Sequence, residues 1–324
     1  MMKPVIGITL GDVAGIGPEV VFKALGEASV FRECRPVVIG DGEAIAECGM
    51  RNAECGIIKE ISEAQFEPGI VNVLDLGNKL GEFKIGRVNK ITGAAAISYI
   101  KKAVELALKG EIKAVVTAPI SKEAINLAGY KYPGHTELLA ELTGTEDFAM
   151  MLACPTLRVV LVTTHLPLAK VPGLLSRERI MTTIRLTNKA LIQLGIPAPK
   201  IAVAGLNPHA GEGGLFGREE EEIIAPSVKA AREEGIDVEG PYPPDTVFRL
   251  KSDAVVVMYH DQGLIPIKLL AFEEAVNVTL GLPIVRTSPD HGTGFDIAGK
   301  NLANPASMIE AIRLAVKMVR RKAK

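Results

Sequence analysis

The chain has 324 residues, of which 48% are hydrophobic, and its 37 basic and 38 acidic residues leave a formal net charge of −1. This length and apolar content are enough for a large buried core or for two domains. The balanced charge gives no bulk attraction to nucleic acid or to anionic membranes. Since there is no tryptophan and only 4% of residues are aromatic, a stacking surface for single-stranded nucleic acid is not expected.

The sequence favours a cytoplasmic protein. No window approaches the roughly 20 apolar residues of a membrane span. The apolar run at residues 5–10 is too short for a signal peptide and has no small-residue cleavage site after it. The four cysteines (Cys34, Cys48, Cys55 and Cys154) show no CxxC spacing, which is typical of buried thiols in a reducing compartment.

Short β-branched runs alternate with helical patterns, which favours an α/β fold with a mainly parallel sheet. In the first part of the chain, strands are predicted at residues 5–10, 36–39, 71–74 and 114–117. A helix is predicted to begin at Gly17-Pro18, because proline suits the first helical turn. Apolar residues recur at helical spacing over residues 92–109, and Ser121 can cap the helix that follows it.

The rest of the chain repeats this alternation. Strands are predicted at residues 159–163, 201–204, 254–258, 277–280 and 284–286. Ser176 is predicted to cap a helix. The acidic run 219–222 is placed in the first turn of the next helix, where acids favour the positive end of the dipole. A last helix is predicted over residues 305–320.

Three of the five histidines follow predicted strands: His165, His209 and His260. In open α/β sheets, ligands bind outside the carboxyl ends of the strands. Three imidazoles at that edge can converge on one cation and leave positions open for substrate, as in catalytic zinc sites. The alternative is that these histidines are structural, since they lie far apart in the sequence.

The residues beside these histidines bear on the same hypothesis. His209 lies in NPHAGEGG, residues 207–214, a glycine-rich turn that can fold tightly round a ligand. His260 lies in YHDQG, residues 259–263. Its neighbour Asp261 can orient a metal ligand or act as a base, although a turn-forming aspartate is the alternative.

A second group of residues suits an anionic ligand. Lys268, Asn277 and Arg286 follow His260, and Lys and Arg supply donors for phosphate or carboxylate. Each is individually typical of a surface position, but near a metal they would suit a small, doubly anionic substrate. His135-Thr136, in PGHTE, forms another candidate substrate-binding turn, with Thr136 alternatively capping the next helix.

Standard cofactor motifs do not decide the activity. Residues 11–17 follow a strand and open a helix, but their spacing is not that of a GxGxxG dinucleotide turn. Neither a GxSxG elbow nor a Walker loop occurs. Residue chemistry alone therefore also allows a three-histidine metallohydrolase, because such sites activate water, or a non-catalytic ligand-binding protein of two α/β lobes.

Longer motifs carry a family resemblance. GDVAGIGPE (residues 11–19) and HGTGFDIAGKNLANP (residues 291–305) resemble the two ends of the β-decarboxylating dehydrogenases, such as isopropylmalate and isocitrate dehydrogenase. PGHTE, TTHLPL, GLNPHAGEGG, PPDT and MYHDQG resemble the 4-hydroxythreonine-4-phosphate dehydrogenase family, over nearly the whole chain. Residues 131–144 and 243–248 look at least as close to a sister group that acts on D-threonate or D-erythronate 4-phosphate.

The resemblance implies two α/β/α domains of isocitrate/isopropylmalate dehydrogenase type with a cleft between them. Residues 1–125 with 285–324 would form the cofactor side, and residues 126–284 the metal, substrate and dimerisation side. The implied metal ligands are His165, His209 and His260. The implied substrate-binding residues are His135, Thr136, Lys268, Asn277 and Arg286. The implied cofactor-binding residues are His291, Gly292, Thr293 and Asp296.

The implied activity is the oxidative decarboxylation of 4-phosphooxy-L-threonine to 3-amino-2-oxopropyl phosphate, in pyridoxal phosphate biosynthesis. Threonate or erythronate 4-phosphate would instead give dihydroxyacetone phosphate. The implied cofactors are NAD, or NADP, and a divalent metal (zinc, cobalt, magnesium or manganese). The general base would be Asp261, Asp245 or Lys268, and the enzyme a homodimer whose active site is shared between its subunits.

Overall fold

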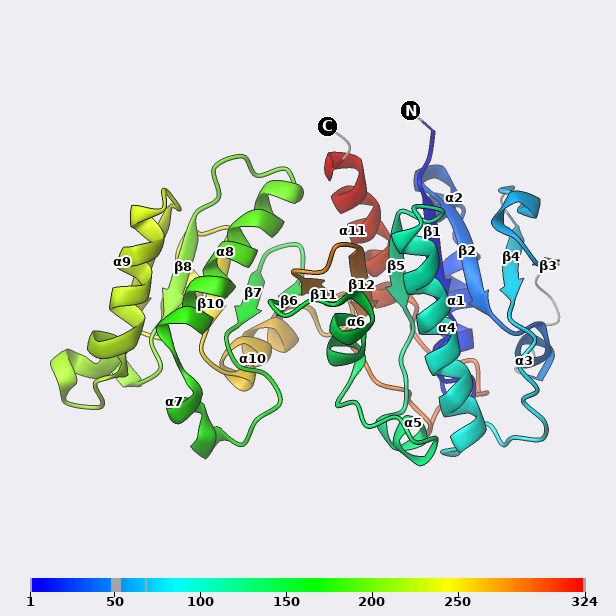
Figure 1. Cartoon of the computed structure of the whole chain (residues 1–324), viewed down its shortest axis with the longest axis horizontal. Coiled ribbons are helices and arrows are strands. Elements are labelled where there is room, and N and C mark those ends of the chain that lie inside the picture. The colour runs from blue at the N-terminus through cyan, green and yellow to red at the C-terminus, as the bar shows by residue number, and fades with distance from the viewer. Residues whose placement is uncertain (1, 48–53, 68, 323–324) are drawn as a thin grey trace. The chain divides into compact units, whose positions relative to one another are not determined.

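The computed structural model describes residues 2–47, 54–67 and 69–322. The chain divides into two compact units (Figure 1). Unit 1 comprises residues 1–146 and 282–324, and unit 2 comprises Asp147–Gly281. Both units alternate strands and helices, so the α/β class predicted from the sequence is confirmed.

Unit 1 contains parallel strands in the order β3-β4-β2-β1-β5-β12. Their bounds are β1 Val5–Thr9, β2 Arg35–Gly40, β3 Glu54–Ile58, β4 Ile70–Asp75, β5 Ala114–Thr117 and β12 Val285–Pro289. The central strands are buried along almost their whole length. This is typical of a parallel sheet that helices cover on both faces.

The helices of unit 1 form two groups. Helices α1 (Gly17–Leu25), α2 (Ala28–Glu33) and α11 (Ala306–Lys322) pack together, and α11 contacts β12, β5 and β1. Helices α5 (Lys122–Leu127) and α6 (His135–Thr143) pack on α4 (Lys90–Leu108), which contacts β1, β2 and β5. A short helix α3, Gly42–Glu47, follows β2 (Figure 1).

Unit 2 contains strands in the order β11-β6-β7-β10-β8-β9. Their bounds are β6 Ala149–Ala153, β7 Arg158–Leu161, β8 Ile201–Ala204, β9 Val238–Tyr242, β10 Ala254–Val257 and β11 Val276–Leu280. Strand β6 runs antiparallel to β7 and β11, whereas β7, β10, β8 and β9 are mutually parallel. Helices α8 (Arg177–Gln193) and α9 (Ala225–Glu233) pack together, and α10 (His260–Ala271) packs on β6, β7 and β10.

Helix starts and strands agree well with the sequence predictions. The hydroxyls of Ser121 and Ser176 both accept the expected capping hydrogen bonds, from the backbone N–H groups of Ala124 and Arg179 at 3.1 Å. The strands β3, β6 and β9 and the helix α10 were not predicted. Helix α10 exposes several large apolar residues and contains Pro266, so it lacks a clean amphipathic period.

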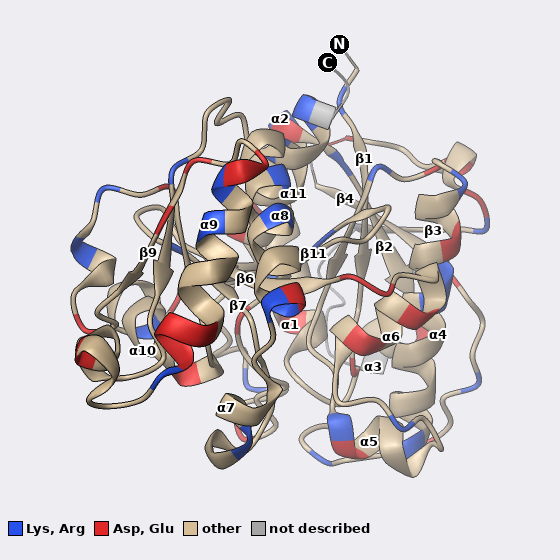
Figure 2. Cartoon of the chain, turned by 60° about the vertical axis from the view of Figure 1, so that its left-hand side comes forward, with Lys and Arg blue, Asp and Glu red and all other residues tan. Residues whose placement is uncertain are grey.

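The charged residues, the helices and the cysteines bear on the expectations drawn from composition. Positions of Lys and Arg and of Asp and Glu are interspersed along both units (Figure 2). None of the helices that the structure describes is both long and apolar enough to cross a membrane. Cys34 and Cys154 are buried free thiols and Cys55 is a half-buried one, while Cys48 lies outside the described residues.

Candidate active site

The three predicted metal-ligand positions lie at one edge of the unit 2 sheet. Strands β7, β10 and β8 are parallel neighbours. His165 follows β7, His260 begins α10 directly after β10, and His209 follows β8. Their predicted place beyond the carboxyl ends of strands is therefore confirmed, because parallel neighbours end at the same edge.

His165 and His260 lie against each other. Their ring centroids are 5.5 Å apart and the rings are tilted by 45°. Metal–nitrogen bonds of about 2.0–2.1 Å place the centroids of two imidazoles on one ion roughly 5 Å apart. A cavity of about 290 Å³ opens beside them, lined by both histidines, Tyr259, Asp261 and part of the segment 164–171. This spacing fits two ligands of a shared divalent ion.

Asp261 contacts the ring of His260. Its Oδ1 lies 2.6 Å from His260 Nδ1, and its side chain is 71% exposed. A metal-binding histidine commonly donates its second ring N–H to a carboxylate, which sets the tautomer and the ring orientation. The pair would leave His260 Nε2 for a metal, so the geometry supports the orienting role for Asp261.

His209 lies on a strained backbone segment. His209, Ala210 and Glu212 all have positive φ angles, of 55°, 54° and 45°, within a left-handed turn. Each such residue costs about 1–2 kcal/mol relative to the right-handed conformation. Strain of this kind persists where surrounding contacts over-determine the backbone, often at ligand-binding sites.

The His209 ring is 66% exposed, with its Nδ1 3.6 Å from Glu212 Oε2. Among the described residues, no group of three or more His, Cys, Asp or Glu side chains is arranged to hold a metal ion. The structure thus brings two of the predicted ligands together and places the third on a neighbouring loop. The donors present fit a divalent ion provided that the His209 segment closes on it.

Glu220 anchors the start of the His209 loop, a role that sequence reasoning missed. Its carboxylate is 3% exposed and lies in a π-helical turn, Glu220–Ile224. Its Oε1 accepts hydrogen bonds from the backbone N–H groups of Leu206 and Asn207, both at 2.7 Å. Its Oε2 accepts from Asn207 Nδ2 at 2.9 Å. Nothing in the sequence separates this glutamate from the acids on either side of it.

Unit 1 holds a buried guanidinium. Arg286 lies within β12 and is 2% exposed, so the surface-charge alternative is wrong. Its Nε and Nη2 donate to Thr117 Oγ1, at 3.2 and 2.6 Å. Burial lowers the pKa of Arg286 to about 9, against the opposing effect of Glu137. Because a desolvated cation is costly, an anionic substrate group would be attracted to it.

His135 is the first residue of α6. Burial, with the positive charges of Arg286 and Lys122, lowers the pKa of His135 well below its ordinary value. The imidazole is therefore neutral, and its buried Nε2 has no hydrogen-bond partner. Thr136 is buried inside α6, whose N-cap is Gly134, so the capping alternative for Thr136 is wrong.

The remaining predicted substrate and base residues belong to unit 2. Lys268 is half-buried on α10, with its Nζ 5.0 Å from the ring centre of Phe272. Asn277 lies in β11, and its buried Oδ1 has no hydrogen-bond partner. Asp245 is exposed on the turn that follows β9. Unit 1 thus carries His135, Thr136 and Arg286, and unit 2 the other substrate-binding candidates.

The predicted cofactor loop packs on the glycine-rich segment that opens α1. Ile16 N donates to Thr293 O at 2.8 Å. A Cβ atom on Gly15 would lie 2.6 Å from that same carbonyl oxygen, so the close approach requires glycine. His291 and Thr293 are half-buried, whereas Gly292 and Asp296 are exposed. Hydroxyl, carboxylate and imidazole groups on this anchored loop fit a nucleotide cofactor.

Two buried acids near that loop were not singled out from the sequence. Glu19, 3% exposed, accepts from the backbone N–H groups of Gly299 and Ala303. Asp12 is fully buried after β1, and its Oδ1 accepts from Ala14 N at 3.0 Å. Burial raises the pKa of the Asp12 carboxyl. Both carboxylates hold backbone in place beside the predicted cofactor loop.

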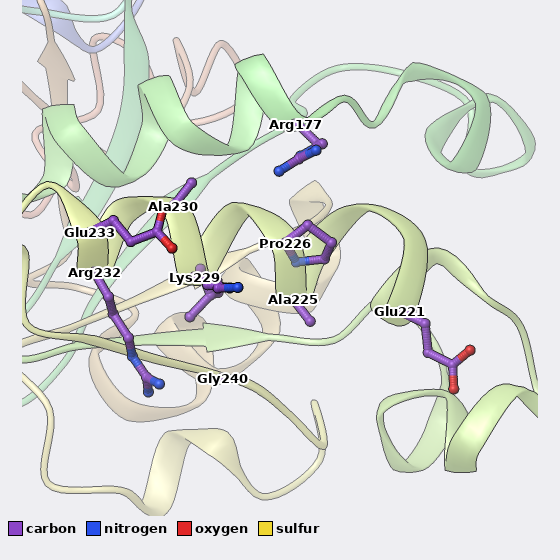
Figure 3. A pocket seen from close by; sticks show the side chains of 10 residues that line it. Arg177, Glu221, Ala225, Pro226, Lys229, Ala230, Arg232, Glu233 and Gly240 are labelled. Atoms are coloured by element: carbon purple, nitrogen blue, oxygen red, sulfur yellow. The ribbon is translucent and has the colours of Figure 1, made fainter.

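A larger hollow of about 690 Å³ lies in unit 2 beside α9 (Figure 3). Its charged lining residues are Arg177, Glu221, Lys229, Arg232 and Glu233. None of the predicted site residues lines it, and its mixed charges do not favour one class of ligand. The candidate site therefore remains at the strand ends.

The chain is similar to known proteins over nearly its whole length. Residues 32–315 match the family of the pyridoxal phosphate biosynthetic protein PdxA. A 4-hydroxythreonine-4-phosphate dehydrogenase from Desulfosudis oleivorans is 50% identical over 97% of this chain and 96% of its own. A D-threonate 4-phosphate dehydrogenase from Cupriavidus necator is 48% identical over 99% of this chain and 98% of its own.

Solved structures resemble the whole chain. The crystal structure of 4-hydroxythreonine-4-phosphate dehydrogenase from Klebsiella pneumoniae has a TM-score of 0.89 and 46% identity, covering 98% of this chain and 100% of its own. A β-decarboxylating dehydrogenase from Thermococcus kodakarensis shares the fold, with a TM-score of 0.52, 18% identity and coverage of 95% and 81%. The predicted fold type is thereby confirmed.

Proposed function

The chain belongs to the PdxA family of oxidative decarboxylating dehydrogenases, and from that premise we propose that its substrate is 4-phosphooxy-L-threonine. The product would be 3-amino-2-oxopropyl phosphate, formed with CO₂ and reduced cofactor in pyridoxal phosphate biosynthesis. The observation that carries the proposal is the pairing of His165 with His260, whose ring centroids are 5.5 Å apart. Two facing imidazoles at the strand ends suit a metal that chelates a hydroxy acid.

His165, His209 and His260 are the proposed ligands of a zinc, cobalt, magnesium or manganese ion. When bound, a divalent ion acidifies a coordinated hydroxyl and stabilises the enolate left by decarboxylation. Asp261 holds the ring of His260 through the 2.6 Å contact with Nδ1. Glu220 fixes the segment that carries His209.

The substrate's anionic groups are assigned to Arg286 and Lys268, because guanidinium and ammonium groups bind phosphate and carboxylate. The neutral His135 ring has a hydrogen bond to the backbone of Ala118 and none at Nε2, so Nε2 and the Asn277 carbonyl oxygen would accept hydrogen bonds from a ligand. Thr136 supplies a hydroxyl beside His135. Each of these groups suits a charged or polar part of a phosphorylated hydroxy acid.

The proton of the reacting hydroxyl needs a base. Asp261 already contacts His260, which favours Asp245 or Lys268 for this step. A nicotinamide cofactor follows from membership of a dehydrogenase family, and we assign it to His291, Gly292, Thr293 and Asp296. NAD is the proposed form and NADP the alternative.

A second substrate has a specific observation in its favour. The relative from C. necator, 48% identical, is a D-threonate 4-phosphate dehydrogenase. D-Threonate or D-erythronate 4-phosphate would give dihydroxyacetone phosphate and CO₂. These acids carry a hydroxyl where 4-phosphooxy-L-threonine carries an amino group, so the same metal and anion contacts would serve both.

The direct test is steady-state kinetics at the NADH absorbance band with the three substrates side by side. We expect a kcat/KM at least tenfold higher for 4-phosphooxy-L-threonine, and a preference for threonate or erythronate phosphate would overturn that assignment. No NADH from any of them, with hydrolysis instead, would favour a three-histidine metallohydrolase. Binding without turnover would indicate a non-catalytic protein.

We also propose that the enzyme is a homodimer. Helix α10 exposes Ile265 and Leu269, at 59% and 81%, and its C-cap residue Phe272 is 71% exposed. Residues spaced four and three apart share one helix face, so these three form an apolar stripe. The stripe lies on the helix that carries His260 and Lys268, and a second copy of the chain covering it would complete the site from both subunits.

A further inference from the structure

Gln262 is a buried amide between the segments that carry His260 and His209. It is 7% exposed and lies in the first turn of α10. Its Oε1 accepts from the backbone N–H of Met258 at 2.6 Å. Its Nε2 donates to the backbone oxygen of Gly205 at 2.7 Å. One side chain therefore joins the end of β10 to the loop after β8.

The same network reaches the third histidine segment. The backbone oxygen of Met258 accepts from Thr163 Oγ1 at 2.7 Å and from Thr163 N at 3.2 Å. Thr163 precedes His165 by two positions and is 6% exposed. Buried hydrogen bonds thus connect the segments of all three histidines. They are made by the backbone N–H and C=O of Met258 and by the side-chain amide of Gln262.

Only an amide satisfies both of these contacts. Met258 N–H needs an acceptor and Gly205 C=O needs a donor, and glutamine supplies one of each. A glutamate would keep the acceptor but set a carboxylate oxygen against the Gly205 carbonyl. Beyond Gly205, Glu220 holds the next two backbone N–H groups. Gln262 and Glu220 therefore hold the base of the His209 loop from two sides.

We propose that Gln262 is a positioning residue that fixes the base of the His209 loop beside the segments of His165 and His260, so that His209 can close on an ion bound by those two histidines. The inference rests on the proposed metal function. Residues that orient metal ligands typically contribute 10–100-fold to metal affinity. Gln262 touches neither metal nor substrate in this assignment, and it acts through the backbone of the His209 loop.

The test is a Co²⁺ titration of the metal-free protein, followed by visible absorbance. Gln262→Met removes both hydrogen bonds at nearly constant side-chain length, and we expect the Kd for Co²⁺ to rise 10–100-fold. Asn72→Leu is the matched control. Asn72 is a buried amide of unit 1 that exchanges two hydrogen bonds with the Gln65 backbone, at 2.7 and 2.8 Å. The Asn72→Leu substitution should lower the melting temperature while leaving the Kd for Co²⁺ within twofold of the wild-type value.

A double-mutant cycle with His209→Ala tests whether Gln262 affects Co²⁺ binding through His209. If Gln262 acts through His209, Gln262→Met changes the Kd less than threefold in the His209→Ala background. An unchanged Kd in the single variant, or a full effect in both backgrounds, overturns the proposal. If His209→Ala itself leaves the Kd unchanged, the three-histidine site has failed instead. Should Gln262→Met not fold, Gln262→Glu keeps the acceptor for Met258 N–H, replaces the donor to Gly205 with an oxygen, and is titrated in the same way.

Discussion

Glu19 and Gly299 are joined by a 2.7 Å hydrogen bond although 280 positions separate them in the chain. The buried carboxylate of Glu19 also accepts from Ala303 N at 3.3 Å. Lys23, one helical turn further along α1, donates to the carbonyls of Asn301 and Ala303. The first helix of the chain therefore holds the loop that is assigned to the cofactor.

Glu19→Gln should weaken cofactor binding. The amide keeps one acceptor but turns an N–H₂ group toward a backbone donor, and hydrogen bonds to charged groups contribute about 1.5–3 kcal/mol. We expect the KM for NAD to rise about tenfold or more with a smaller change in kcat. Asp41→Asn is the control, since Asp41 is a buried carboxylate that accepts from Asn78 N and Tyr99 Oη. An equal fall in melting temperature in both variants, with no change in the KM for NAD, would mean that Glu19 stabilises the fold without affecting cofactor binding.

Glu220→Ala should disrupt the His209 loop. It removes the acceptor of the Leu206 and Asn207 N–H groups, and leaving two buried donors unsatisfied costs about 2–6 kcal/mol in total. We expect that loss in urea unfolding, together with weaker Co²⁺ binding. Glu221→Gln changes a neighbour whose side chain is 51% exposed, and its effect should stay within about 0.5 kcal/mol. Equal Co²⁺ affinity in both variants would contradict the role of Glu220.

The buried imidazole of His135 should make unfolding depend on pH. Its pKa in the folded protein lies well below the ordinary value of 6.5. As the pH falls below 6.5, the unfolded state takes up a proton that the folded state does not, so stability decreases. Stability should rise with pH up to about 6.5 and then level off, with this group adding at most about 1.4 kcal/mol per pH unit.

The comparison between wild type and His135→Gln isolates this contribution. Urea unfolding of both proteins is measured from pH 5 to pH 8. The difference between their unfolding free energies should change with pH only near and below the ordinary histidine pKa of 6.5. A constant difference throughout would mean that folding does not change the pKa of His135, which would contradict its desolvation by burial.

Arg286→Met should separate stability from activity. Burial lowers the pKa of Arg286, so the folded protein disfavours its charge, and methionine removes that desolvation cost at a similar side-chain length. We expect an unchanged or higher unfolding free energy, together with a fall in kcat/KM of about 10²-fold or more for the phosphorylated substrate, because charge-assisted pairs are strong. Arg286→Lys should recover only part of the activity, since lysine lacks the planar fork. Full activity of Arg286→Met would remove this residue from the substrate site.

Leu269→Asp should separate the proposed homodimer. The side chain is 81% exposed at the centre of the apolar stripe on α10, so the folded subunit tolerates aspartate there. Light scattering should change from the mass of two chains to that of one, and activity should fall with it. Lys189→Asp on α8 places the same charge on another helix and should leave the mass unchanged. A monomeric wild-type enzyme with full activity would contradict the shared site.

Local patterns in the sequence determined the α/β class, most strands and the caps at Ser121 and Ser176. They also placed His165, His209 and His260 after strands, because a buried strand is visible as an apolar run and its end as a break in that run. Whether these histidines bind a metal remains a prediction. Strands β3, β6 and β9 escaped this reasoning, and so did α10, whose exposed apolar residues and Pro266 break the amphipathic period.

Only the tertiary structure decided which polar residues are buried and which backbone groups they bind. Glu220 is one of four consecutive acids, and Glu19 and Gln262 each lie in the first turn of a helix. Local patterns therefore suggest that each of these side chains is exposed to solvent. Their partners are backbone N–H and C=O groups of other segments. These groups become available where a loop leaves regular structure, and such pairings between distant segments exist only once the strands have aligned their ends at one edge.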